Sequence, residues 1–180
     1  TTGEPLPNGP PMSSTVPDNA EVHNTGEVWA TMLWEGYASM LAAAQGASPP
    51  YTFAEARRRM ADYVVAGMKL APQEPTFTEQ RDGIIAAAYT ADAADGLLLA
   101  QGFAKRGAGS CAVSPAKDST DNSGVVESFT LAPDLVITGV TVDDGVSSCD
   151  NDGILDAGET GHVTVDIVNR GGGAAQNTLV

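Results

Sequence analysis

The sequence predicts a mainly α-helical subdomain followed by a partial all-β, sandwich-like module. Apolar residues recur at intervals of three and four up to about residue 106, and they alternate with polar residues in two short segments after residue 134. A stretch rich in Ser, Asp, Asn, Gly and Pro separates the two patterns. We therefore expect a helical subdomain over residues 1–110, a linker over 111–133 and a truncated β-sandwich module over 134–180.

The first predicted helix is the central element of the helical subdomain. From Trp29 to Ala44, apolar residues return at the spacing of one wide helical face. We expect Gly46 to end this helix and the Pro- and Gly-rich residues 1–22 to form a loop. Gly36 lies on the apolar face, where its missing side chain is expected to leave the packing loose.

Three further helices are predicted by their end signals. Residues 52–55 and 76–79 both have the pattern Thr-Phe-x-Glu, in which Thr and Glu can cap a helix start reciprocally. A fourth helix is expected over about 92–106, with Lys105 and Arg106 in its last turn, where the helix dipole favours cations. About four helices joined by short links make the first subdomain mainly α.

The β-module is predicted from two strands, over residues 135–142 and 162–169. Both segments are rich in Val, Ile and Thr, and the second alternates polar with apolar residues as far as Ile167. Because two strands alone cannot bury a core, the module is expected to be partial.

The charge and hydropathy of the chain argue against two classes of partner. The net charge is −14 and only nine residues are basic, whereas binding to nucleic acid by counterion release needs clustered Lys and Arg. No apolar run approaches the roughly 20 residues that a membrane span requires. We therefore expect neither a nucleic-acid partner nor a membrane span.

Cys111 and Cys149 are the only cysteines, and the sequence leaves two states open for them. They could form one disulfide bond, if their geometry allows it, or stay as two free or separately paired thiols. They are too few for a metal cluster.

His23 is the candidate catalytic residue of the helical subdomain. It is one of two histidines and lies just before the apolar helix, with Asp18 five residues upstream. A carboxylate that accepts a hydrogen bond from one ring nitrogen fixes the tautomer and the orientation of the other, which is the role predicted for Asp18. The simpler interpretations are that His23 is a surface loop residue or caps the helix start, and that Glu21 is a loop charge.

The residues around His23 resemble a known family. Glu21-Val22-His23, followed by Gly26-Glu27-Val28-Trp29-Ala30, is similar to a segment of the fungalysin family of secreted, thermolysin-like zinc metallopeptidases. Residues 75–87 and 103–109 are similar to later fungalysin segments, in the same order. The resemblance covers about residues 18–110.

The resemblance implies that the helices form the C-terminal, thermolysin-like domain of a secreted, extracellular zinc metalloendopeptidase that hydrolyses peptide bonds. In that family, the histidine that matches His23 donates a hydrogen bond to the oxyanion formed during peptide hydrolysis. The zinc-binding motif His-Glu-x-x-His is absent from this sequence. We therefore expect the zinc ligands in an N-terminal half of the same protein, so that this chain alone is inactive and needs that half and a protein or peptide substrate as partners.

The loop between the two predicted strands is a candidate calcium site. Against the template of a calcium-binding loop, Asp150, Asp152, Asp156 and Glu159 occupy positions 3, 5, 9 and 12. Position 1 is Ser148 and strands flank the loop, so this is not an EF-hand, and a plain turn rich in Asp and Asn is the alternative.

Two other functions stay open at this point. The chain could belong to a non-catalytic extracellular calcium-binding or adhesion module, whose helices serve only as a scaffold. It could also belong to an enzyme relic that has lost its zinc ligands. An intact His-Glu-x-x-His motif upstream would distinguish the peptidase from both.

Overall fold

The computed structural model describes residues 21–169 and 171–175, and the chain divides into two compact units over residues 1–131 and 132–180. The first unit contains four α-helices and the second a two-stranded antiparallel sheet. The predicted fold class, a mainly α subdomain with a partial β-module, is therefore confirmed. No described helix is long and apolar enough to span a membrane.

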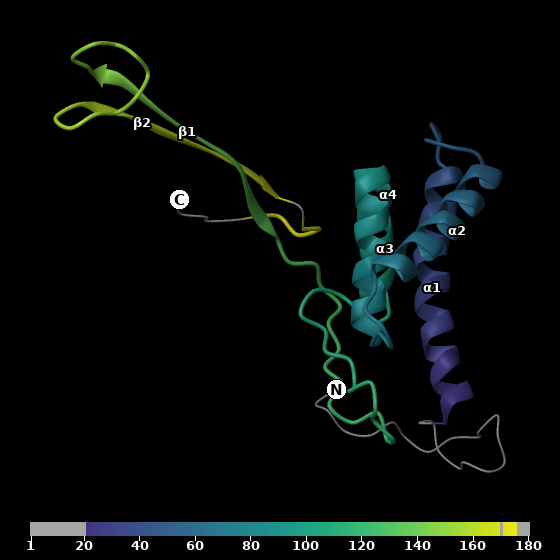
Figure 1. Cartoon of the computed structure of the whole chain (residues 1–180). Helices are drawn as coiled ribbons and strands as arrows, with labels where there is room; N and C mark the ends of the chain where they lie inside the picture. Colours follow the sequence, from purple (N-terminus) through teal and green to yellow (C-terminus); the bar gives the residue numbers. More distant parts are fainter. Residues whose placement is uncertain (1–20, 170, 176–180) are drawn as a thin grey trace. The chain divides into compact units, whose positions relative to one another are not determined.

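The four helices of the first unit pack into one cluster (Figure 1). Helix α1 contacts α2 and α4, and α3 also contacts both α2 and α4. Both predicted capping boxes are present. The Thr52 amide donates to Glu55 and the Thr76 amide to Glu79, each at 2.8 Å, and each threonine side chain accepts from the amide of the same glutamate. The helices span α1 Val22–Ala44, α2 Phe53–Leu70, α3 Phe77–Ala91 and α4 Ala93–Lys105.

Helix α1 starts earlier than the apolar spacing indicates. Val22 is its first residue, so His23 lies in the first helical turn and not in a preceding loop. The reason is local: the Glu21 side chain accepts hydrogen bonds from the amides of His23 and Asn24, which satisfies two donors that a helix start leaves unpaired.

The core of the helical unit lies where the four helices meet. The Trp29 ring stacks on Phe77 of α3 and on Phe103 of α4, with centroid distances of 5.8 and 5.9 Å. These contacts tie the first half of α1 to two other helices. The largest apolar side chains that are fully buried are Phe103, Met40, Ile84 and Leu99.

Glycines let two pairs of helices approach closely. A Cβ on Gly102 of α4 would lie 2.5 Å from the Gly36 Cα of α1, and a Cβ on Gly67 of α2 would lie 2.5 Å from Ile84 Cγ1 of α3. Real Cβ atoms do not come so near, so neither position has space for a side chain. The expectation that Gly36 leaves the packing loose is therefore wrong, since the space beside it is filled by α4.

A buried polar cluster links α2 to α4. The Asp95 carboxylate is 1% exposed and accepts hydrogen bonds from Tyr63 Oη at 2.7 Å and from Arg59 Nη1 at 2.9 Å. Arg59 Nη1 also donates to Asp92, the N-cap residue of α4. Burial and the hydrogen bond to Asp95 raise the pKa of Tyr63 to about 12. The cluster therefore keeps the Tyr63 phenol neutral as a hydrogen-bond donor to Asp95.

The segment after α4 folds back along the helices. Gly107 adopts a φ of +80°, and buried Arg81 of α3 donates from Nη1 to the carbonyl oxygens of Ala108 and Gly109 at 3.0 and 2.9 Å. Backbone hydrogen bonds then join Val113 to Val126. Residues up to 131 thus lie in the first unit. The division into a subdomain over 1–110, a linker over 111–133 and a module over 134–180 stays a prediction.

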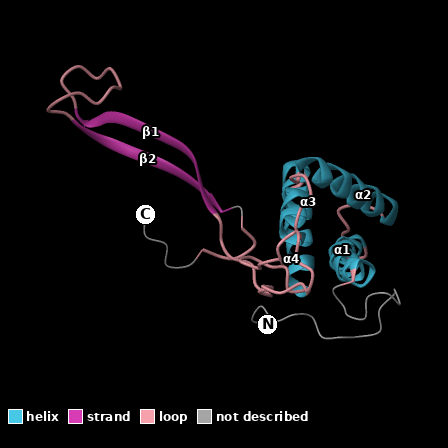
Figure 2. Ribbon diagram, turned by 60° about the horizontal axis from the view of Figure 1, so that its bottom comes forward, coloured by secondary structure: helices cyan, strands magenta, loops and turns pink. Residues whose placement is uncertain are grey.

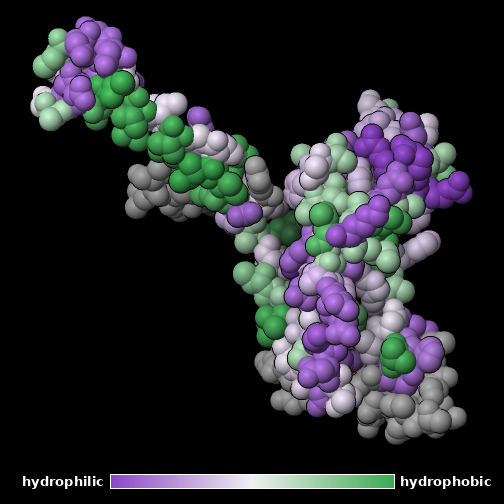
Figure 3. Space-filling model, viewed as in Figure 1, coloured by the Kyte–Doolittle hydropathy of each residue, from purple (hydrophilic) through white to green (hydrophobic). Residues whose placement is uncertain are grey.

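The second unit is one long ribbon made of β1 Leu135–Ser147 and β2 Thr160–Asn169 (Figure 2). Directly paired residues of antiparallel strands share a face, and the register places the apolar pairs Ile137–Ile167, Val140–Val165 and Val142–Val163 on one face. The opposite face carries polar pairs such as Thr141–Thr164 and Asp143–His162. Figure 3 shows hydrophobic side chains along the ribbon and hydrophilic ones gathered at its end.

The contact between α1 and α4 predicts the effect of adding one methyl group. We expect Gly102→Ala to lower the free energy of unfolding of the helical unit by roughly 1–3 kcal/mol, because the methyl group would force the two backbones apart. Chemical denaturation followed by far-UV circular dichroism measures this change.

Gly26→Ala, a glycine-to-alanine change in α1 away from the contact with α4, is the matched control. Gly26 lies within α1, and a Cβ added to it would have nothing within 4 Å, so alanine should raise stability by roughly 0.5–1 kcal/mol through helix propensity alone. Equal effects of the two substitutions would contradict the close approach of α1 and α4.

The buried cluster predicts how stability changes at alkaline pH. Tyr63→Phe should cost roughly 1–3 kcal/mol at neutral pH, because Asp95 loses one buried hydrogen bond. Below pH 10 the tyrosine is neutral in both the folded and unfolded states, but between the ordinary tyrosine pKa of 10.0 and the folded-state pKa of about 12 only the unfolded state ionises. The gap in unfolding free energy between wild type and Tyr63→Phe should therefore narrow over this range in urea titrations, and a constant gap would contradict the assignment.

Candidate functional site

His23 lies at the exposed N-terminal end of α1, beside a buried carboxylate. Its imidazole is 65% exposed, whereas the Glu21 side chain is 5% exposed. Glu21 Oε1 lies 2.6 Å from His23 Nδ1, and Oε2 accepts from the His23 amide at 2.9 Å. One oxygen of the carboxylate thus holds the ring while the other caps the helix.

The same contacts set the charge of Glu21. Burial by itself raises the pKa of this carboxyl, but hydrogen bonds from the His23 ring and from the amides of His23 and Asn24 outweigh it. The net pKa of Glu21 lies below its ordinary value. Glu21 is therefore an ionised acceptor at neutral pH.

The sequence interpretation of Glu21 as a loop charge is wrong, because the residue is buried at the helix start. Glutamate is not among the residues preferred at the N-cap, so no local signal pointed to this role. Asp18, the predicted partner of His23, lies outside the described residues, and its contact with His23 stays a prediction.

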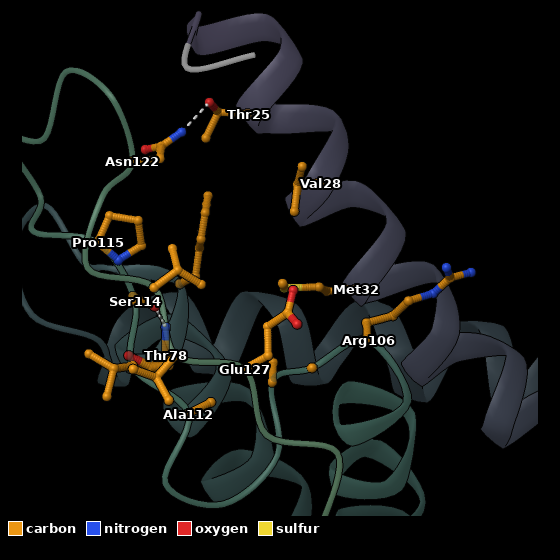
Figure 4. A pocket seen from close by; sticks show the side chains of 16 residues that line it. Thr25, Val28, Met32, Thr78, Arg106, Ala112, Ser114, Pro115, Asn122 and Glu127 are labelled. Carbon is orange, nitrogen blue, oxygen red and sulfur yellow. Dashed lines mark hydrogen bonds between the residues drawn. The ribbon is translucent and has the colours of Figure 1, made fainter. Parts of the chain in front are cut away.

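An apolar pocket lies on another side of α1 (Figure 4). Thr25, Val28 and Met32 of α1 face Pro115 and Asn122 of the returning segment across a hollow of about 120 Å³, and Asn122 Nδ2 donates to Thr25 Oγ1 at 2.9 Å. Residues two apart on an α-helix point about 200° away from each other. Because Thr25 faces this pocket, His23 points away from it, so the pocket is not the place where His23 would meet a substrate.

The described residues do not supply a catalytic zinc site. Such a site uses imidazole nitrogens together with a carboxylate or a thiolate. The group of residues that could jointly hold a metal ion in the described part of the chain consists of three carboxylates, from Asp144, Asp150 and Glu159. Oxygen donors alone suit a hard cation such as Ca²⁺ and not catalytic Zn²⁺.

The carboxylates of the acidic loop gather around Glu159. Glu159 Oε1 accepts from the Cys149 amide at 2.7 Å and Oε2 from the Asp156 amide at 2.9 Å, and these bonds lower its pKa. Ligand oxygens of Asp144, Asp150 and Glu159 lie within 4.8 Å of one another. Asp144, which lies outside the 12-residue loop template and which the sequence leaves open as a further ligand or only a charge, is 6% exposed and lies on β1.

Two predicted ligands are not part of this group. Asp152 Oδ1 accepts from the Ile154 amide at 2.8 Å, which is a turn contact, and Asp156 contributes its amide to Glu159. Their roles as calcium ligands stay predictions.

Both cysteines are exposed and free in the structure, Cys111 in the first unit and Cys149 in the acidic loop of the second. Cys149 takes part in the loop through its backbone, since its amide donates to Glu159.

Comparison with known proteins places the helical unit in a peptidase family. The profile of the fungalysin metallopeptidase family matches residues 8–112, which is more than half of the chain. This range contains all four helices and His23.

Individual relatives agree with the family match. Extracellular metalloproteinase 3 of Arthroderma otae is 37% identical over 112 residues, which cover 58% of this chain and 18% of that protein. The protein of the same name from Trichophyton tonsurans is 33% identical over 126 residues, which cover 66% of this chain and 20% of that protein.

The chain thus spans about a fifth of the length of these curated relatives, with shares of 18% and 20%. The family match covers the residues that the sequence resemblance rests on, from the segment around His23 to the end of α4. The chain belongs to the fungalysin metallopeptidase family.

Proposed function

We propose that this chain is part of a secreted zinc metalloendopeptidase and that it supplies the group that stabilises the oxyanion. The observation that supports this best is the contrast at the start of α1, where an exposed His23 ring is held at Nδ1 by a buried, ionised carboxylate. The other ring nitrogen, Nε2, has no hydrogen bond to any described residue and can reach a substrate. Relatives named extracellular metalloproteinases support secretion.

The proposed role follows from the hydrogen-bonding capacity of an imidazole. With the Nδ1 proton shared with Glu21, the protonated ring can also donate from Nε2. When a nucleophile adds to a peptide carbonyl, negative charge develops on the carbonyl oxygen, and a fixed donor aimed at that oxygen stabilises the transition state. Such a donor typically contributes about 10²–10³ in rate.

We propose that the zinc ligands belong to an N-terminal half of the same protein, because the described residues of this chain do not fit a catalytic zinc site. When bound there, zinc would polarise the reacting carbonyl and activate water. This chain on its own would then bind no catalytic zinc and cleave no peptide, and its partners would be that half and a protein or peptide substrate.

The proposal predicts a specific kinetic defect in the full-length parent protein. His23→Ala should lower kcat by about 10²–10³ on a peptide substrate, because the developing oxyanion loses one donor. Bound zinc, measured by elemental analysis, should stay stoichiometric.

His162→Ala is the matched control, since His162 is the other histidine of the chain and lies in the β-unit. It should leave kcat unchanged. Loss of zinc in His23→Ala would mean that His23 is a ligand, and an unchanged kcat would exclude the oxyanion role.

We also propose calcium binding at the loop between β1 and β2. The supporting observation is that Asp144, Asp150 and Glu159 bring carboxylate oxygens within 4.8 Å of one another. Calcium binds six to eight oxygen ligands, so turn carbonyls, water, Asp152 or Asp156 would complete the shell. If the chain instead belongs to a non-catalytic calcium-binding or adhesion module, this loop would be its functional site.

The calcium proposal predicts binding that depends on the central carboxylates. Isothermal titration of the 180-residue chain with CaCl₂ should give saturable binding, and calcium should raise the unfolding temperature of the β-unit. Asp150→Asn should weaken the binding at least tenfold, because one ligand charge is lost. Asp118→Asn, an exposed acidic residue outside the loop, is the control. A parent chain whose stability is the same with and without calcium would contradict the site.

A further inference from the structure

We propose that Glu21 is the positioning residue for His23, which fixes the ring tautomer and directs Nε2 outward. This inference rests on the oxyanion role proposed for His23 and adds a residue to it. Glu21 would not touch the substrate itself and would act through the imidazole.

The geometry makes Glu21 a rigid support. Its carboxylate makes three contacts, with His23 Nδ1 at 2.6 Å, the His23 amide at 2.9 Å and the Asn24 amide at 3.4 Å. With 5% exposure, it is screened from water that would compete for these donors. The N-terminal end of α1 also favours a negative charge at this position. The carboxylate is therefore oriented by the helix start and in turn orients the ring.

The direction of the contact determines which nitrogen carries the proton. An ionised carboxylate can only accept hydrogen bonds, so His23 Nδ1 must be the donor in this pair. Nε2 is then the nitrogen that gains or loses a proton at the exposed end of the ring. A histidine without such a partner would divide its proton between both nitrogens and rotate about its side-chain bonds.

The length of the Glu21 side chain matters for this arrangement. Serine at the same position can accept from the helix amides, as N-cap serines do, but its hydroxyl is too short to reach the ring as well. Glu21→Ser therefore keeps the helix cap and removes only the contact with the imidazole. This substitution separates positioning of His23 from helix stability.

The first experiment uses the 180-residue chain and needs no zinc or substrate. Nitrogen-15 NMR of the two histidines, recorded where both rings are neutral, reports which nitrogen carries the proton. We expect His23 to be protonated mainly at Nδ1 in the wild type and mainly at Nε2, the form that a free imidazole prefers in water, in Glu21→Ser. His162, which contacts Asp143 in the other unit, is the internal control and should not change.

Two results would overturn the proposal. One is an unchanged His23 tautomer in Glu21→Ser with native helicity by circular dichroism, and the other is a change produced by Asp18→Asn but not by Glu21→Ser. Glu21→Asn, which also caps helices, serves as a second variant if Glu21→Ser fails to fold.

The second experiment measures catalysis in the full-length parent protein. Glu21→Ser should lower kcat about 10- to 100-fold, as removal of an orienting carboxylate typically does, with zinc content unchanged. If His23→Ala lowers kcat and Glu21→Ser does not, the positioning role fails alone. If neither lowers kcat, the proposed function of His23 fails as well, whatever the NMR spectrum shows.

Discussion

The close approach of α1 to α4 is the constraint on which the helical unit depends. Gly102 packs against the Gly36 backbone with no space for a Cβ of its own, and Glu35 of α1 pairs with Lys105 and Arg106 at the end of α4. Contact between backbones fixes two helices more firmly than contact between long side chains, because little can adjust. His23 lies roughly 20 Å along the same helix from Gly36. The packing of the helix that carries His23 is thus fixed in part by a contact far from the ring.

The start of α1 combines burial and exposure in neighbouring residues. Trp29 stacks against Phe77 of α3 and Phe103 of α4, the N-cap Glu21 is 5% exposed, and the His23 side chain is 65% exposed. Glu21 is the N-cap residue and has a non-helical backbone, with φ −59° and ψ 139°, so its side chain can turn back over the first helical turn and contact His23 two positions on. A hydrogen-bond donor near an exposed surface is fixed in this way without being buried itself.

The parts of the fold that could be predicted are those with local causes. The capping boxes at Thr52 and Thr76 and the apolar spacing of α1 need only neighbouring residues, and all four helices were predicted. The contacts of Gly36 with α4 and of Arg81 with two carbonyl oxygens join residues far apart in sequence, and no local pattern encodes them. At the candidate site, His23 was identified through a family resemblance, whereas Glu21 was missed because its role depends on burial.

The β-unit shows why a strand pattern can mislead even when both strands are predicted. In β1 the apolar residues fall at positions 135, 136, 137, 140, 142 and 146, which does not keep a period of two. The register shift between Ile137 and Gly139 adds one residue at Thr138, and this bulge returns Val140 and Val142 to the face of Ile137. Apart from the Val136–Val168 pair, the reverse face is polar, and an apolar face with a polar reverse is what one layer of a sandwich requires. The bulge, which only pairing with β2 reveals, therefore gives this two-stranded unit the apolar face that a sandwich layer would need.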